Sequence, residues 1–143
     1  MTTVNDLLRN KPSDIWTVAP EDSVYDALRL MDEKNIGVVL VIDSGRLIGL
    51  LTERDYARKL VLHHKSSRET PVRDVMATHV AYIEPGKEIE DCMALMTERR
   101  FRYLPVMDND RLVGLVSIGD LVKAVIADKK FMIEQLEHYI SGQ

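Results

Sequence analysis

The chain contains an internal repeat, which constrains its fold more than any other feature of the sequence. Shifted by 65 positions, residues 17–61 align on residues 82–126 without a gap, and twelve of the 45 aligned pairs are identical. A shorter match at an offset of 68 relates residues 4–8 to residues 72–76, so the first copy has three additional residues near 10–15. Because a unit of about 60 residues buries too little apolar surface to be stable alone, we expect the two copies to pack together around a pseudo-two-fold axis.

Hydrophobic patterning predicts the same secondary structure in both copies: strand, helix, strand, strand and helix. The first strand is expected at 15–18 and again at 80–83. Two apolar runs separated by a short polar turn then predict a β-hairpin, at 38–51 in the first copy and at 103–116 in the second. This order gives a mixed α/β (α+β) fold in which each copy is a β-α-β-β-α unit.

Helices are predicted where apolar residues recur at i, i+3, i+4 and i+7. The first helix of each copy begins near Val24 or Ile89, and Ser23 is a candidate N-cap for the first of them. A closing helix follows each hairpin. Beyond the second one, residues 128–140 have an amphipathic pattern, so a C-terminal helix is expected to dock its apolar face either on its own chain or on a partner.

Composition excludes several functional classes. Lys and Arg number 19 against 23 Asp and Glu, and the resulting charge of -4 disfavours a nucleic-acid-binding surface. Cys92 is the only cysteine and the 4 histidines lack ligand spacing, so we expect no disulfide and no metal site. No segment has the pattern of a membrane span or a secretory signal, which favours a cytoplasmic protein. With no nucleophile–base pair in view, we expect no catalytic residues and no enzyme activity.

The motif with the most chemical content joins the last strand to the last helix of each copy. It is Gly49-Leu-Leu-Thr-Glu-Arg-Asp55 in the first copy and Gly114-Leu-Val-Ser-Ile-Gly-Asp120 in the second. A hydroxyl followed three residues later by an acid is the pattern of a helix capping box, which would be purely structural. The same groups also suit a nucleotide, because a hydroxyl and amides at a helix N-terminus bind phosphate while the acid accepts ribose hydroxyls. Both interpretations stay open, and the presence of the motif in both copies favours the second.

These residues resemble a cystathionine-β-synthase (CBS) domain. In the first copy the resemblance rests on Pro20, the hydrophobic helix, residues 38–43 and 46–49, and Thr52-x-x-Asp55. In the second copy it rests on 101–108, 112–117 and Asp120. The resemblance implies two domains, at 4–63 and 72–127, joined by a linker at 64–71 and followed by the C-terminal helix at 128–143. Two such units form a CBS pair, or Bateman module, and residues 52–59 and 66–71 also resemble free-standing bacterial two-domain members.

The resemblance implies that adenosine compounds bind in one or both clefts between the copies, AMP or NAD(H) foremost, with ADP, ATP and S-adenosylmethionine as further members of the class. Asp55 and Asp120 would hold the ribose hydroxyls. The phosphate would lie near Thr52, Arg54, Ser117, Arg102 and Arg100. The adenine would lie between the first strand and apolar residues of the second, at Ile15, Trp16, Thr17, Val18, Val80, Ala81, Tyr82, Gly37, Val38, Tyr103, Leu104 and Pro105.

Charge differs between the two copies around this motif. Arg54 and Arg102 stand where the other copy has Gly119 and Gly37. The cleft that combines Asp55 with both arginines is therefore expected to hold phosphate more tightly, while the other is empty or holds a less anionic ligand. Alternatively, these arginines form only a solvated helix end.

The favoured function is a non-catalytic sensor that binds an adenine nucleotide and transmits a conformational change to an unidentified regulated protein. Inosine-monophosphate dehydrogenase also contains such domains, but its catalytic barrel needs about 250 residues, which this chain lacks. Two alternatives remain: a ligand-free structural dimer, and a nucleic-acid-binding protein acting through residues 63–68. The resemblance also implies a homodimer.

Overall fold

A computed structural model describes residues 2–10 and 15–142, which divide into two compact units. One unit holds the described residues of Asp14–Val80, and the other combines those of Met1–Ser13 with those of Ala81–Gln143. The repeats therefore exchange their leading segments: residues 4–8 belong to the unit of the second copy, and residues 72–76 to the unit of the first. For the sequence repeats themselves, 4–63 and 72–127 stay our proposed boundaries.

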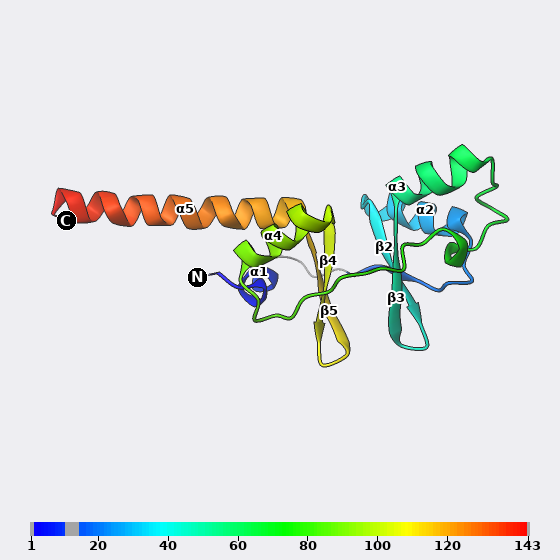
Figure 1. The fold of residues 1–143 in the computed structure, drawn as a ribbon, viewed down its shortest axis with the longest axis horizontal. Helices are drawn as coiled ribbons and strands as arrows, with labels where there is room; N and C mark the ends of the chain where they lie inside the picture. The colour runs from blue at the N-terminus through cyan, green and yellow to red at the C-terminus, as the bar shows by residue number, and fades with distance from the viewer. Residues whose placement is uncertain (1, 11–14, 143) are drawn as a thin grey trace. The chain divides into compact units, whose positions relative to one another are not determined.

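The unit of the first copy is a three-stranded sheet with a helix beside it (Figure 1). Strand β2 (Val38–Asp43) lies in the middle, parallel to β1 (Thr17–Val18) and antiparallel to β3 (Arg46–Thr52). Helix α2 (Val24–Lys34) is capped as predicted by Ser23, whose hydroxyl accepts a hydrogen bond from the amide of Asp26 at 3.0 Å. The short 3-10 helix η3 (Val72–Asp74) completes this unit.

The unit of the second copy has the same plan with one strand fewer. Its elements are α1 (Val4–Arg9), α4 (Ile89–Arg99), β4 (Tyr103–Asp108), β5 (Arg111–Ser117) and α5 (Ile118–Ser141). The strand predicted at 80–83 is wrong, because only an isolated parallel bridge joins Ile83 to Val106. In the first copy the Leu40 amide donates to the Trp16 carbonyl at 3.0 Å. Pro105 occupies the position equivalent to Leu40 and has no N–H to donate, so the ladder stops one residue short.

Both predicted hairpins are confirmed. The turn residues Ser44 and Gly45 have φ of 52° and 79°, and Asn109 and Asp110 have φ of 48° and 67°. Two successive positive φ values are typical of the type I′ turn, whose twist matches that of the strands it joins. Each hairpin also has an irregular register at the same point of the repeat, after Val41 in one and Val106 in the other.

Equivalent residues build the two hydrophobic cores, which explains why the repeat survives as a pattern. Seven buried pairs stand 65 positions apart: Val18/Ile83, Val24/Ile89, Ala27/Cys92, Met31/Met96, Val39/Leu104, Val41/Val106 and Leu51/Val116. The exchanged segments contribute a further two pairs at the offset of 68, Val4/Val72 and Leu7/Val75. Each leading segment thus fills the same place in the core of the unit that it joins.

The closing helices of the two copies differ. In the first, a short turn α3 (Glu53–Asp55) continues as a π-helix, η1 (Tyr56–Leu60), and ends as a 3-10 turn, η2 (Val61–His63). In the second, α5 runs without a break for 24 residues, so the expected separate helix at 128–143 is instead the continuation of the closing helix. No Gly or Pro interrupts the sequence between Asp120 and Ser141, and Gly142 ends the helix in the left-handed conformation.

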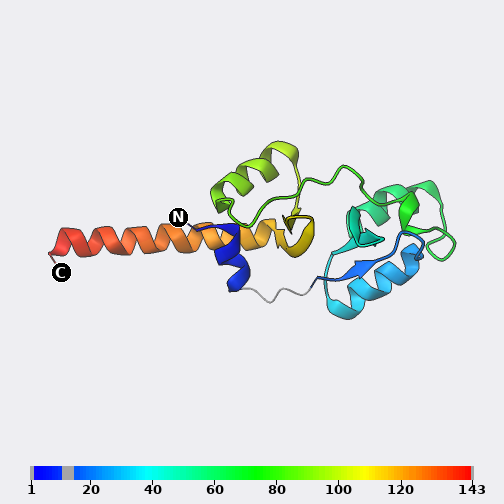
Figure 2. The same cartoon turned by 90° about the horizontal axis from the view of Figure 1, so that it is seen from below.

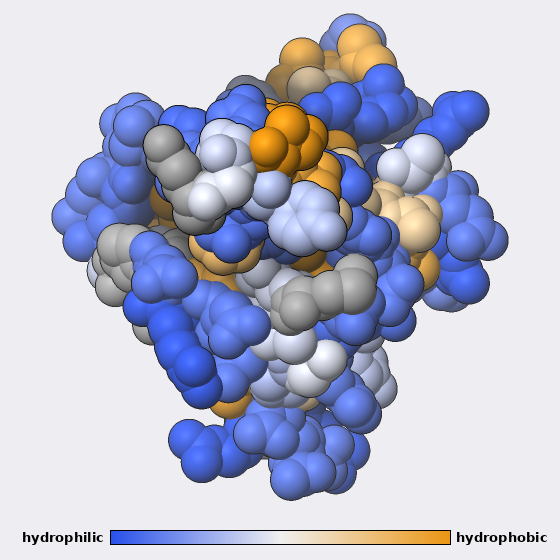
Figure 3. All heavy atoms as spheres, turned by 90° about the vertical axis from the view of Figure 1, so that its left-hand side faces the viewer, coloured by the Kyte–Doolittle hydropathy of each residue, from blue (hydrophilic) through white to orange (hydrophobic). Residues whose placement is uncertain are grey.

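Helix α5 extends well past α1 and α4 of its own unit, as both ribbon views show (Figures 1 and 2). Leu121 near its beginning is buried, whereas Ile133, Leu136 and Ile140 are more than half exposed. From the side of the C-terminus, hydrophobic side chains come to the surface among hydrophilic ones (Figure 3). Among the described residues, no helix combines the length and apolarity needed to cross a membrane.

Candidate functional site

The Thr52–Asp55 motif forms a complete capping box at the start of α3. The Asp55 amide donates to Oγ1 of Thr52 at 3.2 Å, and the Thr52 amide donates to Oδ2 of Asp55 at 3.0 Å. The Thr52 hydroxyl lies 3.0 Å from the same carboxylate oxygen. These bonds hold the Asp55 side chain at the end of β3. The prediction that the motif forms a helix capping box is therefore confirmed.

The equivalent motif of the second copy has the same geometry. The Ser117 amide donates to Oδ2 of Asp120 at 2.9 Å, and the Asp120 amide donates to Oγ of Ser117 at 3.1 Å. Hydroxyl and carboxylate therefore lie side by side at the strand-to-helix junction of both units. Each unit by itself presents the pair of groups that the sequence singled out.

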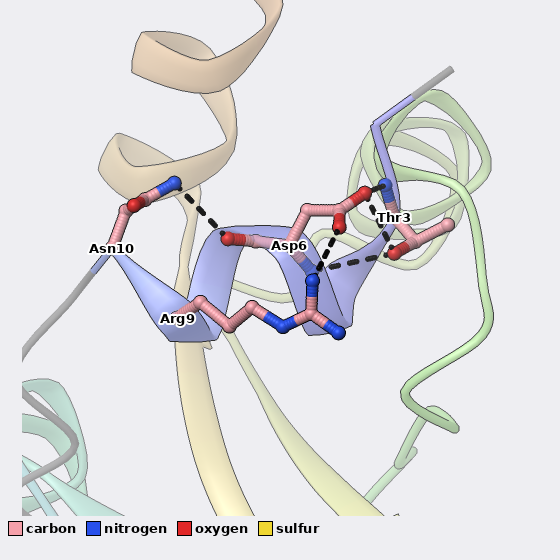
Figure 4. A network of polar contacts seen from close by, with 4 residues as sticks. All are labelled: Thr3, Asp6, Arg9 and Asn10. Atoms are coloured by element: carbon pink, nitrogen blue, oxygen red, sulfur yellow. Dashed lines mark hydrogen bonds and ion pairs between the residues drawn. The ribbon is translucent and has the colours of Figure 1, made fainter.

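A third capping box, which the sequence analysis missed, begins α1 (Figure 4). The Thr3 amide donates to Oδ2 of Asp6 at 3.0 Å, and the Asp6 amide donates to Oγ1 of Thr3 at 3.3 Å. The Thr3 amide, the Thr3 hydroxyl 3.1 Å from Oδ2, and the Arg9 guanidinium 3.6 Å from the carboxylate hold the pKa of Asp6 below its ordinary value of 3.8. The signal was present as a Thr-x-x-Asp pattern at residues 3–6. No ligand role is proposed there, so this box is a natural control for the other two.

The first helical amide of each repeated junction bonds to the residue that precedes the adjacent strand, whereas in α1 the equivalent Val4 amide donates to the loop carbonyl of Lys87 at 2.8 Å. The Glu53 amide donates to the carbonyl of Gly37 at 3.2 Å, just before β2 begins. The Ile118 amide donates to the carbonyl of Arg102 at 2.9 Å, just before β4. Gly37 and Arg102 are equivalent positions of the repeat. Each junction is therefore tied to the start of the adjacent strand of its own unit.

Lys59 is a basic residue at the first junction that the sequence analysis did not identify. Its ammonium lies 3.4 Å from Oδ1 of Asp55 and donates to the carbonyl of Val75 at 3.2 Å. The Asp55 side chain is only 16% exposed, and that of Lys59 is 46% exposed. A ribose that approached Oδ1 of Asp55 would compete with this ammonium. The second copy has Ala124 at the equivalent position.

The residues predicted to surround the adenine lie in or just before strands β1, β2 and β4, apart from residues 80–82, which precede the isolated bridge at Ile83. Trp16 is half-buried, and its ring faces the Lys34 ammonium at 4.4 Å from the ring centroid. Thr17 is exposed and Val18 is buried, while Tyr82 in the second copy is 64% exposed. The remaining predicted residues are partly or fully buried, namely Ile15, Gly37, Val38, Val80, Ala81, Tyr103, Leu104 and Pro105. The sequence did not predict this contact between Lys34 and the Trp16 ring.

The predicted phosphate-binding arginines are all exposed side chains. Arg54 belongs to the unit of the first copy, and Arg100 and Arg102 belong to that of the second. Arg100 ends α4 in the left-handed conformation with φ of 58°. Within residues 2–10 and 15–142, no group of three His, Cys, Asp or Glu side chains is arranged to hold a metal ion.

Comparison with known proteins gives a consistent result. The family model described as "CBS domain" matches residues 4–62 and 72–127. The Arabidopsis thaliana "CBS domain-containing protein CBSX3, mitochondrial" is 34% identical over 151 residues, covering 99% of this chain and 73% of that protein. The Bacillus subtilis "CBS domain-containing protein YhcV" is 35% identical over 121 residues, covering 85% and 84%.

Among solved structures, a Burkholderia ambifaria protein with CBS domains superposes with a TM-score of 0.85 and 54% identity. The match covers 89% of this chain and 96% of that one. Its description suggests a role in signal transduction.

Proposed function

Because this chain belongs to the CBS-domain family and contains a tandem pair of these domains, we propose that it is a regulatory module that binds an adenine nucleotide, AMP or NAD(H) foremost. The nucleotide biases the conformation of the module, which a regulated partner protein then senses. No bond is made or broken in this function. The single cysteine favours a reducing compartment, and we propose the cytoplasm.

The observation that supports nucleotide binding is the paired hydroxyl and carboxylate at the same junction of both units. The cap holds Oδ2 of Asp55, so Oδ1 is the oxygen that would accept ribose hydroxyls, with Lys59 displaced. Thr52 and Ser117 would lie next to the phosphate, where helix N-termini favour anions. Asp120 would serve the second junction in the same way.

Charge within the units favours the first junction for phosphate. Glu53 and Arg54 follow the Thr52 cap with opposite charges, and the ammonium of Lys59 adds a positive charge beside Asp55. The cap of the second copy is followed by Ile118 and Gly119, which bring no charge. We therefore propose unequal affinities, with the Asp55 site binding more anionic nucleotides. Arg100 and Arg102 are the remaining proposed phosphate contacts.

The test is thermal denaturation of the full chain with AMP, ADP, ATP and NAD(H). A ligand that binds only the folded state stabilises it, by about 2.7 kcal/mol at a concentration of 100 Kd. We expect a rise in Tm with at least one nucleotide. If none shifts Tm at millimolar concentration, nucleotide binding is wrong and the chain acts as a ligand-free interaction module.

Variants then assign the sites. Asp55→Ala and Asp120→Ala should each remove one class of site in calorimetric titrations, and Arg102→Ala and Arg100→Ala should weaken binding of phosphorylated ligands. Asp6→Ala is the matched control, because it breaks a capping box of the same geometry. It should lower Tm while the affinity stays unchanged. If both Asp55→Ala and Asp120→Ala bind nucleotide normally, the two capping boxes only stabilise their helices and do not bind the ligand.

A further inference from the structure

The part of α5 beyond the core of its unit presents an apolar stripe that nothing in the described chain covers. Ile126, Ile133, Leu136 and Ile140 are 62%, 55%, 59% and 82% exposed. Because an α-helix has 3.6 residues per turn, these four side chains lie along one side of α5. A contiguous exposed apolar surface of this kind marks an interaction site.

The stripe has the seven-residue spacing of a coiled coil. Ile126, Ile133 and Ile140 fall at the a positions, and Val122, Lys129 and Leu136 fall at d. Lys129 is the one charged residue in this series, and its ammonium lies 3.8 Å from the Glu90 carboxylate of α4. Its aliphatic stem can therefore pack in the seam while the charge stays outside.

The flanks of the stripe differ in character. On one flank lie Lys130 and Glu137, both at e positions. On the other flank lie Met132 and Tyr139, both at g positions and more than half exposed. Phe131, which is 61% exposed, points from the opposite side of the helix.

We propose that this stripe is the surface through which two copies of the chain associate, with the two α5 helices antiparallel. Leu136 would pack against the partner's Ile133, and Ile133 against the partner's Leu136. A helix pair of this kind gives the expected homodimer a defined interface and orientation. It does not require a bound nucleotide.

The flanking residues favour a second copy as the occupant and favour the antiparallel orientation. In an antiparallel pair, e positions face e positions and g positions face g positions. Lys130 then lies near the partner's Glu137 and Met132 near the partner's Tyr139, and each contact occurs twice. In each of the pairs 130/137, 133/136 and 132/139, the mean of the two residue numbers is close to 134. A single two-fold axis that passes near residue 134 of both helices therefore generates all three contacts. A parallel pair would instead set Lys130 against Val125 and Glu137 against Met132, without any charge pair.

The first experiment asks whether the stripe makes the dimer. Sedimentation velocity of the full chain over a concentration series should show a monomer–dimer equilibrium. Ile133→Asp should raise the dissociation constant at least 100-fold, and it should fold normally because residue 133 lies on an exposed surface. Phe131→Asp, the matched control on the opposite side, should leave the dissociation constant within about threefold. A monomeric wild type, a dimeric Ile133→Asp variant, or equal dissociation of both variants would overturn the proposal.

The second experiment tests the orientation. Lys130→Glu and Glu137→Lys should each weaken the dimer at least tenfold, because each places like charges together in an antiparallel pair. An equimolar mixture of these two variants should dimerise as tightly as the wild type, since opposite charges then meet at both contacts. If the single variants associate normally, or if the mixture is no tighter than either variant alone, the antiparallel register is wrong.

Discussion

A Cβ atom built on Gly114 would lie 2.7 Å from Cδ2 of Leu8, so α1 packs directly on the backbone of β5. Gly49, the equivalent residue of the first copy, has the same relation to the other exchanged segment. A Cβ there would lie 2.8 Å from Sδ of Met76 and 2.8 Å from the carbonyl oxygen of Ala77. Close packing of the exchanged segments therefore explains the two glycines of the repeated motif without any ligand.

These contacts predict that Gly49→Ala destabilises the protein more than Gly114→Ala does. At Gly114 the added methyl meets the end of a flexible leucine, which can move, whereas at Gly49 it also meets a backbone carbonyl, which cannot. We expect losses of about 1 kcal/mol for Gly114→Ala and about 3 kcal/mol for Gly49→Ala in denaturant unfolding. Equal losses, or the reverse order, would show that the Ala77 backbone yields easily.

The capping box of α1 predicts a pH effect with a definite sign. Because hydrogen bonds from Thr3 hold the pKa of Asp6 below 3.8, the box stabilises the fold above that pH. The contribution is lost as the pH falls below 3.8 through the lower pKa of the folded state. Carboxyl NMR titration should show this low midpoint, and Thr3→Val, which keeps the backbone donor but removes the hydroxyl, should move it upward. An unchanged midpoint in Thr3→Val would mean that the hydroxyl has no effect.

The first hairpin turn predicts a stabilising substitution. Ser44 has φ of 52°, a left-handed value that Asn tolerates better than Ser, and Gly45 follows it. Ser44→Asn should therefore raise the free energy of unfolding by about 0.5 kcal/mol. Gly45→Ala is a control with the opposite expected effect. It should lower the free energy of unfolding by about 1 kcal/mol, because the φ of 79° at this position is unfavourable for a residue with a Cβ atom. Thermal unfolding measures both, and a loss of stability in Ser44→Asn would contradict the prediction.

We expect the thiol of Cys92 to react only after the fold opens. The side chain is fully buried in the core, and burial raises the pKa of the thiol. A thiol-specific chromogenic reagent at pH 8 should modify the folded protein slowly and the urea-unfolded protein at the rate of a free cysteine. Fast modification without denaturant would show that this core opens readily. Cys92→Ala should remove the signal entirely.

Much of the fold could be predicted because the core positions repeat. Val24 and Ile89, like Met31 and Met96, are apolar for the same reason in both units, and the alignment exposed them. The sequence did not predict the exchange of leading segments, because the core pattern of residues 4–7 and 72–75 is the same in either arrangement. Nor did it predict the lost strand at 80–83, which follows from the missing amide of Pro105.

For the candidate site, the sequence identified the repeated groups but not their neighbours. Thr52 and Asp55 were found because hydroxyl and acid recur at a fixed spacing. The contacts of Lys59 with Asp55 and of Lys34 with the Trp16 ring were missed because they depend on how the helices are wound and packed. The π-helical turn at Tyr56–Leu60 has no periodicity that a sequence pattern would reveal.

The exchange of leading segments also sets an order of events during translation. Helix α1 leaves the ribosome first, yet its backbone partners include the carbonyls of Pro85 and Lys87, about eighty residues further along the chain. At about 5–20 residues per second, α1 must wait on the order of several seconds before those partners are made. Meanwhile the unit of the first copy is completed by residues 72–76. Nascent chains stalled once residue 80 has emerged from the ribosome should therefore hold one folded unit and an unpartnered helix, exposed to chaperones.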